Sequence, residues 1–240
     1  MRAELRKARR AAIEFARLVY MKRYLPLLII VAVALVTAGT GAMLYRAKMA
    51  ASAVKPTGAP VEGSDSGLRH VEGNVNAPVT LEIYGDFQCP ACAMASEVID
   101  DLRKEYGSHL KVVFYQFPLA MHAHALEAAM AAEAAGEQGH FWPMHDVLYR
   151  YQPIWSKVSD PMRFFVAYAH TMGLDVRRFE ADAKSDALKA RIEAEGEAGV
   201  ARGVTNTPTI FVNGNQVRGV FTGGNLKSMI DAALAARKKS

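Results

Sequence analysis

The chain contains two cysteines, Cys89 and Cys92, which are separated by two residues. Residues 78–84 before them are rich in β-branched and aromatic side chains, which favour a strand, and the alanine-rich residues 93–106 predict a helix. A cysteine where a strand leads into a helix lies at the helix N-terminus, where unpaired N–H groups and the helix dipole stabilise a thiolate. Because the thiolate is the nucleophile of disulfide exchange, we expect Cys89 to react first and Cys92 to resolve the mixed disulfide.

Two other uses of paired cysteines fit this chain less well. A structural disulfide between residues so close in sequence closes a very short loop and stabilises little in the chain-entropy model. A structural zinc site has four ligands, often two cysteine pairs, and this chain has no second pair. Histidines would have to complete a metal site, so the pattern favours redox chemistry and leaves metal binding as an alternative.

The formal net charge of +5 is concentrated at the N-terminus. Basic residues crowd residues 1–24, where Glu4 and Glu14 are the acidic residues: Arg2, Arg6, Lys7, Arg9, Arg10, Arg17, Lys22 and Arg23. The remainder of the chain is close to neutral, so the high isoelectric point does not indicate nucleic-acid binding. We expect no nucleic-acid partner and interpret residues 1–24 as a basic cytoplasmic segment.

Residues 25–45 predict a transmembrane signal-anchor. Residues 25–44 carry no charge and are mostly Leu, Ile, Val and Ala, and about 20 apolar residues cross a bilayer as a helix. The preceding basic cluster places the N-terminus in the cytoplasm and everything after residue 45 outside it. A cleaved signal peptide is the alternative, because residues 40–42 are small, but the apolar run exceeds the usual signal length of about 7–15 residues.

The rest of the chain predicts an α/β domain interrupted by helices. Residues 46–77 are rich in Ala, Gly, Ser and Pro and predict a flexible linker, with a short edge strand at residues 70–73. The other predicted strands are residues 78–84, 110–117, 209–212 and 216–218, and the last helix covers residues 225–237. The helical segments of residues 119–203 are too long for a crossover between adjacent strands. They therefore predict a helical lobe inserted between residues 78–118 and residues 204–240.

Two motifs resemble those of the DsbA-like thioredoxin-fold thiol–disulfide oxidoreductase family. One is the Cys-Pro-Ala-Cys sequence of residues 89–92, in which Pro90 suits the first helical turn. The other is Thr207-Pro208, directly before the strand at residues 209–212. The resemblance covers roughly residues 77–238 and implies a thioredoxin-like fold with an inserted helical lobe.

The resemblance also implies roles for individual residues. In this family the proline directly before that strand is cis and faces the dithiol. The resemblance therefore implies that Pro208 is cis and that the Thr207 backbone pairs with a substrate strand. The residues between the cysteines, here Pro90 and Ala91, tune the redox potential. The resemblance implies no metal and no cofactor beyond the two sulfurs.

Residues 117–124 and 139–145 resemble the start of that family's lobe and its second helix. We interpret Phe141 and Trp142 as core of the lobe, and the histidines of these segments as surface or capping residues.

One position departs from the family pattern. Many relatives carry a buried acid six residues before the first cysteine, and this chain has Ile83 there. Glu82 is one residue earlier, and the alternation of a strand sends it to the opposite face of the sheet. Asp86 matches a common family feature, but we predict a catalytic role for neither acid. The group that takes the Cys92 proton is therefore unassigned.

The leading hypothesis is a membrane-anchored oxidoreductase, periplasmic or extracellular, that introduces disulfide bonds into exported proteins. Its partners would be reduced exported substrates and a membrane redox partner that reoxidises it. A reductase or isomerase on the same fold remains open, because Pro90, Ala91 and Thr207 do not indicate one direction. Two less favoured hypotheses are a thioredoxin-fold copper carrier and a module that only binds unfolded chains.

Overall fold

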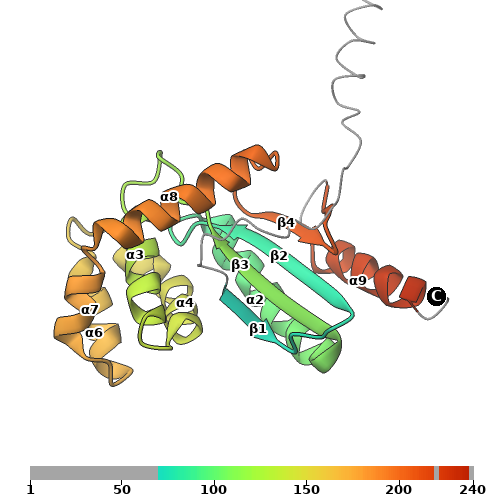
Figure 1. Ribbon diagram of the computed structural model, residues 1–240, viewed down its shortest axis with the longest axis horizontal. Helices are drawn as coiled ribbons and strands as arrows, with labels where there is room; N and C mark the ends of the chain where they lie inside the picture. The colour runs from blue at the N-terminus through green and yellow to red at the C-terminus, as the bar shows by residue number, and fades with distance from the viewer. Residues whose placement is uncertain (1–69, 219–221, 238–240) are drawn as a thin grey trace, which may run out of the picture. The chain divides into compact units, whose positions relative to one another are not determined.

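The computed structural model describes residues 70–218 and 222–237 (Figure 1). The predicted basic segment, the predicted transmembrane segment and the predicted linker up to residue 69 lie outside these residues. Within the described ranges, no helix is both long enough and apolar enough to span a bilayer.

Five strands form one mixed sheet in the order β1-β3-β2-β4-β5. The strands are β1 (His70–Gly73), β2 (Val79–Gly85), β3 (Leu110–Gln116), β4 (Thr209–Val212) and β5 (Asn215–Gln216). The central pair β2 and β3 is parallel, and every other neighbouring pair is antiparallel. Parallel neighbours need a crossover, and α2 (Pro90–Tyr106) provides it, followed by the short 3-10 helix Gly107–His109.

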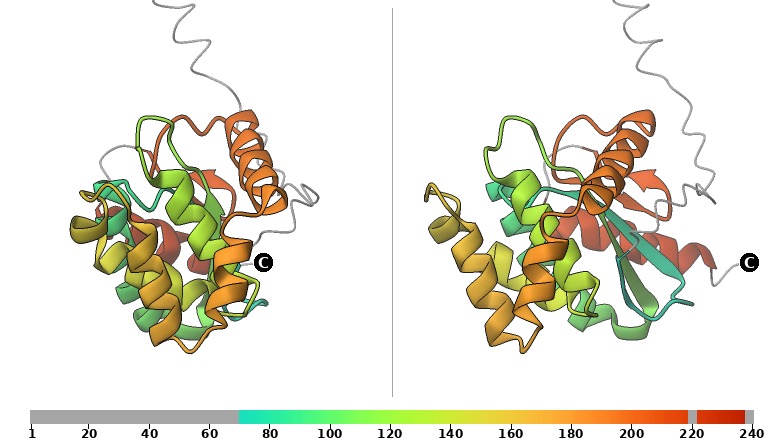
Figure 2. Two further views of the ribbon diagram at one scale, coloured as in Figure 1. Left: turned by 90° about the vertical axis from the view of Figure 1, so that its left-hand side faces the viewer. Right: turned by 60° about the vertical axis from the view of Figure 1, so that its left-hand side comes forward.

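The remaining helices fall in two groups, one between β3 and β4 in the chain and one after β5. They are α3 (Ala125–Gly136), α4 (Phe141–Arg150), α5 (Gln152–Trp155), α6 (Met162–Thr171), α7 (Val176–Asp182), α8 (Asp186–Ala201) and α9 (Gly223–Arg237). Helices α3 to α8 lie in the chain between β3 and β4, as the sequence predicts, and Figure 2 shows α3, α4, α6 and α7 gathered beside the sheet. Helix α9 follows β5 and packs against α2, β2 and β4.

The alternation of β2 divides its side chains between two faces of the sheet. Leu81 and Ile83 join the main core together with Ile99 of α2. Tyr84 belongs to a separate cluster that includes Phe211 of β4. The face that carries Ile83 is therefore the one that α2 covers, and this alternation decides which side chains of β2 reach the cysteines.

The lobe is built around α3, an alanine-rich helix that is buried on nearly all sides. Its small side chains let α4, α6, α7 and α8 pack against it. Asp175 and Ser185 are the N-caps of α7 and α8, and each side chain accepts a backbone N–H three residues further on.

The short edge strand predicted at residues 70–73 is confirmed as β1. Two predicted boundaries are wrong, and one helix is missing from the prediction. The linker is predicted to reach residue 77, but β1 pairs with β3 and Nε2 of His70 lies 2.9 Å from the carboxylate of Glu133 in α3, so these residues belong to the domain. The return strand lies at Asn215–Gln216 rather than residues 216–218, because Asn213 and Gly214 both have positive φ and form a two-residue turn. The short helix α5 is absent from the sequence prediction, since four residues carry no helical period.

Candidate active site

Both cysteines lie where β2 leads into α2. Cys89 is the N-cap residue of the helix, with extended backbone angles (φ −76°, ψ 119°), and Pro90 occupies the first turn. The Cys92 N–H donates to the Cys89 carbonyl oxygen at 3.0 Å. The two residues are 7% and 3% exposed, so Cys89 lies at the edge of the core and Cys92 within it. This arrangement confirms the predicted position of the pair at a helix N-terminus.

The loop before the cysteines is shaped by the buried carboxylate of Asp86. It accepts the backbone N–H groups of Gln88 at 2.7 Å and Leu119 at 2.9 Å, and lies 2.7 Å from Nδ1 of His122. The Asp86 carbonyl also accepts the Cys89 N–H. Asp86 therefore holds the active-site loop against residues 119–122, a structural role that agrees with its not being predicted catalytic. His122 is a partner of this carboxylate rather than a simple surface residue.

A second buried side chain fixes the loop from the lobe. The Gln152 amide of α5 donates to the carbonyl oxygens of Phe87 at 2.6 Å and Cys89 at 3.0 Å. Sequence reasoning missed Gln152, because a glutamine more than 60 residues away gives no local signal of this contact.

The Thr207–Pro208 peptide bond is cis, which confirms the expectation for Pro208. The fold brings this loop to the dithiol, where the Cys89 thiol donates to the Thr207 carbonyl oxygen at 3.4 Å. The Thr207 hydroxyl is buried and has no hydrogen-bond partner. The Thr207 side chain nevertheless lowers the pKa of both cysteines.

The surroundings shift the pKa values of the two cysteine thiols in opposite directions. A hydrogen bond from the Cys92 side chain is the main reason why the pKa of Cys89 falls to about 5. The Thr207 hydroxyl and the N–H groups of Cys92 and Ala91 add to this effect, and burial opposes it. The pKa of Cys92 is strongly raised, first by burial and then by the neighbouring Cys89 sulfur. Since Cys89 is then mostly ionised at neutral pH, it is the nucleophile of the pair.

The prediction that Glu82 and Ile83 lie on opposite faces of the sheet is confirmed. Ile83 faces the interior beside Cys92, and Glu82 lies on the opposite face. There its carboxylate accepts two hydrogen bonds from Arg202, at 2.9 and 2.6 Å, and the guanidinium lies 4.0 Å from the ring centroid of Phe211. Glu82 therefore links the end of α8 to the sheet and does not reach the cysteines.

The remaining predicted residues are found as follows. Pro90 is exposed and Ala91 half-buried at the start of α2. Phe141 is core as predicted, and Trp142 is partly buried against it. His145 is 5% exposed, so interpreting it as a surface or capping residue is wrong. Among the described residues, no three His, Cys, Asp or Glu side chains gather as a metal site.

This geometry agrees with the family to which the chain is matched. Residues 65–232 match the family model described as thioredoxin. The chain therefore belongs to the thioredoxin family. Within it, the fold is that of the DsbA-like thiol–disulfide oxidoreductases.

Three solved structures illustrate the similarity of fold. A thioredoxin-like oxidoreductase from Silicibacter pomeroyi is 24% identical, with a TM-score of 0.59 over 70% of this chain and 92% of that one. BdbD from Bacillus subtilis is 22% identical, with a TM-score of 0.62 over 69% of this chain and 92% of its own. The α-DsbA1 protein of Wolbachia pipientis is 18% identical, with a TM-score of 0.63 over 70% and 92% of the two chains.

Curated relatives of higher identity are much longer proteins. The Na(+)/H(+) antiporter NhaA of Herminiimonas arsenicoxydans is 37% identical over 169 residues, which are 70% of this chain and 26% of that protein. An antiporter NhaA 1 of Mycolicibacterium gilvum is also 37% identical, over 68% of this chain and 26% of its own length. The chain spans about a quarter of these relatives, so their name describes them and not this chain.

Proposed function

We propose that this protein is a thiol–disulfide oxidoreductase that works through Cys89 and Cys92 and introduces disulfide bonds into exported proteins. The observation that carries the proposal is the geometry of the pair: Cys89 is the N-cap residue of α2 against the cis Thr207–Pro208 loop, and Cys92 is buried one turn further along the helix. The pKa of Cys89 is accordingly lowered to about 5, and that of Cys92 is raised. One reactive sulfur beside one buried, protonated sulfur is the arrangement that a two-step exchange requires.

The proposed reaction begins with the Cys89–Cys92 disulfide. A substrate thiolate attacks the Cys89 sulfur and forms a mixed disulfide, while the Cys89–Cys92 bond breaks and its electron pair passes to the Cys92 sulfur, which takes a proton. A second substrate thiolate then attacks the substrate sulfur of the mixed disulfide. The substrate leaves oxidised, and Cys89 leaves as a thiolate. A thiol of low pKa is a good leaving group, so this last step is fast.

The same low pKa supports the oxidising direction. A stabilised Cys89 thiolate favours the reduced protein over the disulfide, and this makes the disulfide a strong oxidant. The reductase or isomerase alternative predicts a weaker preference for the reduced form. The copper-carrier alternative is tested by the metal content of the purified reduced protein.

The loop at Thr207 and Pro208 is the proposed substrate-binding element. It lies directly against Cys89, and the Thr207 backbone can pair with an extended substrate segment whose sulfur then meets Cys89. Pro90 and Ala91 are the proposed redox-tuning positions, and the N–H of Ala91 already contributes to the low pKa of Cys89.

We further propose that residues 25–45 anchor the protein in a membrane, with the catalytic domain on the exported side. The apolar run and the basic residues before it support this topology. A membrane redox partner would then reoxidise the dithiol. Retention of the full chain in carbonate-washed membranes is expected, and its release into the soluble fraction would contradict the anchor.

The function is tested by three measurements on the purified full-length chain. Cys89→Ser should abolish oxidation of a dithiol peptide, whereas Cys92→Ser should accumulate mixed disulfides on non-reducing gels. The reduction potential, equilibrated in glutathione buffers, should lie near about −120 mV. A value near about −270 mV would reverse the proposed direction. An active Cys89→Ser variant would refute the mechanism itself.

A further inference from the structure

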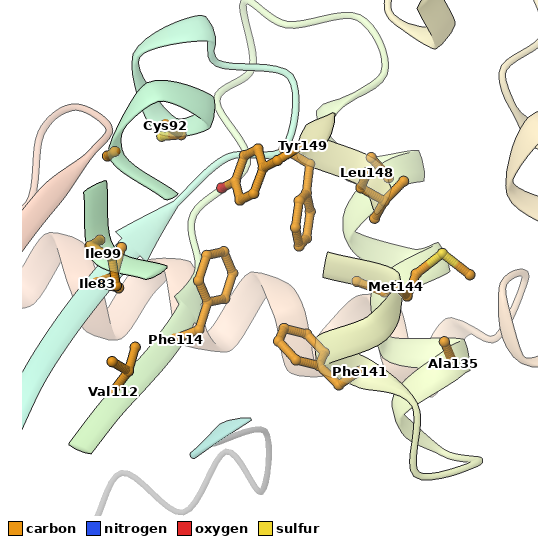
Figure 3. Packing of buried hydrophobic residues seen from close by; sticks show 14 of the residues in the cluster. Ile83, Cys92, Ile99, Val112, Phe114, Ala135, Phe141, Met144, Leu148 and Tyr149 are labelled. Atoms are coloured by element: carbon orange, nitrogen blue, oxygen red, sulfur yellow. The ribbon is translucent and has the colours of Figure 1, made fainter. Parts of the chain in front are cut away.

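A tyrosine hydroxyl lies against the buried cysteine. Tyr149 of α4 is 6% exposed, and it lines the same small cavity as the buried Cys92. Figure 3 shows this hydroxyl directed away from α4, toward the helix and strand that carry Cys92 and Ile83. The backbone leaves room for it at Gly85, where a Cβ would lie 2.9 Å from the hydroxyl oxygen.

Beside this hydroxyl is a small cavity. It measures about 20 Å³ and is lined by Cys92, Tyr149, His145 and Ile83, among others. A cavity of about 10–15 Å³ holds one water when polar groups can bind it, and Tyr149 and His145 supply such groups. Ile83 contributes an apolar wall, so no carboxylate of β2 reaches this space.

Polar groups continue from the cavity toward the surface. His145 is one turn before Tyr149 on α4, and their rings meet edge to face at a centroid distance of 4.9 Å. Nδ1 of His145 lies 2.9 Å from the carboxylate of Asp146, whose side chain is 41% exposed. His145 is otherwise enclosed by aromatic rings, including those of Phe87 and Phe114. It therefore joins the buried cavity to a solvent-exposed acid.

The reaction needs a proton at this place. When a substrate thiolate opens the disulfide, the electron pair arrives on the Cys92 sulfur, which lies in the core and is a poor site for a charge. In the reverse sense, the Cys92 thiol must lose a proton before it attacks a mixed disulfide at Cys89. Glu82 is bound to Arg202 on the other face of the sheet, so it cannot serve.

We propose that the Tyr149 hydroxyl passes the proton to and from the Cys92 sulfur, and that His145 exchanges this proton with solvent across the cavity. As the hydroxyl proton moves to sulfur, the tyrosine oxygen takes one from a water in the cavity, and that water takes one from His145. The proton ultimately comes from solvent, so no charge remains on the tyrosine. This inference rests on the proposed function and adds the acid–base groups of its buried step.

Burial keeps Tyr149 in the state that this relay needs. The pKa of Tyr149 is raised well above its ordinary value, first by burial and then by the sulfur of Cys92. The side chain therefore stays a neutral donor at neutral pH. If its purpose were only to fill the core, a phenylalanine would serve equally well, and this difference is the basis of the test.

The experiment follows reduced full-length protein after mixing with excess oxidised glutathione, by acid quench and mass spectrometry. The first step forms the Cys89–glutathione disulfide, and the second is the attack of Cys92 that releases glutathione. Tyr149→Phe should slow the second step by about 100-fold, a usual contribution of acid–base catalysis, and leave the first unchanged. Tyr84→Phe, which removes another buried hydroxyl on the opposite face of the sheet, should change neither step.

The outcomes separate the relay from the function. A fall of less than about tenfold in the second step for Tyr149→Phe would overturn the relay, as would an equal fall in both steps. If Cys92→Ser, which cannot carry out the second step, forms no Cys89–glutathione disulfide, the proposed function itself fails.

His145 acts on the Cys92 sulfur only through Tyr149 in this scheme, as the group that exchanges the proton with solvent, and a double-variant cycle tests it. His145→Gln keeps a polar side chain of similar size and should slow the second step alone. Because both residues serve one path, the Tyr149→Phe, His145→Gln double variant should be no slower than the slower single variant. Losses that multiply would show two independent packing effects and would overturn the assignment of His145.

Discussion

Cys89 and Cys92 have the same side chain and opposite acidity because their sulfurs face different surroundings. The Cys89 sulfur meets donors from the helix N-terminus, the Cys92 thiol and the Thr207 hydroxyl. The Cys92 sulfur is surrounded by core and by the hydroxyl of Tyr149. At Cys89 the hydrogen-bond donors outweigh burial and lower the pKa, whereas at Cys92 burial outweighs the donors and raises the pKa.

The first residue-scale prediction concerns the hydroxyl of Thr207. Thr207→Val keeps the shape of the side chain and removes a donor to the Cys89 thiolate, so the pKa of Cys89 should rise by about one. The ultraviolet absorbance of the thiolate, titrated with pH, measures it. Thr209→Val is the matched control, because its hydroxyl donates to the Asn206 carbonyl instead. An unchanged Cys89 titration in Thr207→Val would contradict the prediction.

The second residue-scale prediction concerns the buried carboxylate of Asp86 in the active-site loop. Asp86→Ala leaves the buried N–H groups of Gln88 and Leu119 without an acceptor, so the free energy of unfolding should fall by about 2–4 kcal/mol. Asp101→Ala removes an 81% exposed carboxylate and should change it by less than about 0.5 kcal/mol. Urea unfolding of both variants provides the comparison, and equal midpoints would show that the Asp86 network does not stabilise the fold.

At the scale of elements, α8 contains two glycines with different surroundings. A Cβ at Gly199 would lie 2.9 Å from Tyr84 and 3.0 Å from Phe117, so α8 approaches the sheet closely only because this side chain is missing. Gly196 is one turn earlier on the same helix, and a Cβ there would meet nothing within 4 Å. Substitution of the two glycines by alanine therefore distinguishes the effect of helix propensity from the effect of packing against the sheet.

Gly199→Ala should lower the free energy of unfolding by about 1–3 kcal/mol through overpacking. Gly196→Ala should raise it by about 0.5–1 kcal/mol, because alanine favours a helix where no contact opposes it. Chemical denaturation of both variants measures the difference. Stabilisation by both substitutions would mean that α8 moves away from the sheet at little cost.

For the whole molecule, the acidity of Cys89 makes the stability of the reduced protein depend on pH. Its folded-state pKa of about 5 lies below the ordinary value of 9.0, so between these values the unfolded reduced chain binds a proton that the folded one does not. The free energy of unfolding of the reduced protein should therefore rise with pH across this range, and the gain should vanish as pH falls through about 5. The raised pKa of Cys92 acts only above its ordinary value, outside this range.

Urea unfolding under reducing conditions, repeated from about pH 5 to about pH 8, measures this slope. Cys89→Ser provides the control, because its side chain does not titrate in this range, and it should lose the part of the slope that belongs to the thiolate. The same slope in both proteins would show that other groups cause it.

The sequence by itself determined the local features of this protein. Strands β2, β3 and β4 and helix α2 were predictable because alternation and helical composition are properties of neighbouring residues. The cysteine pair at a helix N-terminus and the placement of Glu82 and Ile83 on opposite faces of the sheet follow from the same local rules.

Tertiary structure alone decided what surrounds the sulfurs. Gln152, Tyr149 and His145 reach the site from helices of the inserted lobe, and no sequence pattern relates them to Cys89 or Cys92. The burial of His145 and the pairing of β1 with β3 likewise depend on contacts across the fold. The physical reason is that pKa values and buried hydrogen bonds depend on distances in space, which only the packing of the lobe against the sheet sets.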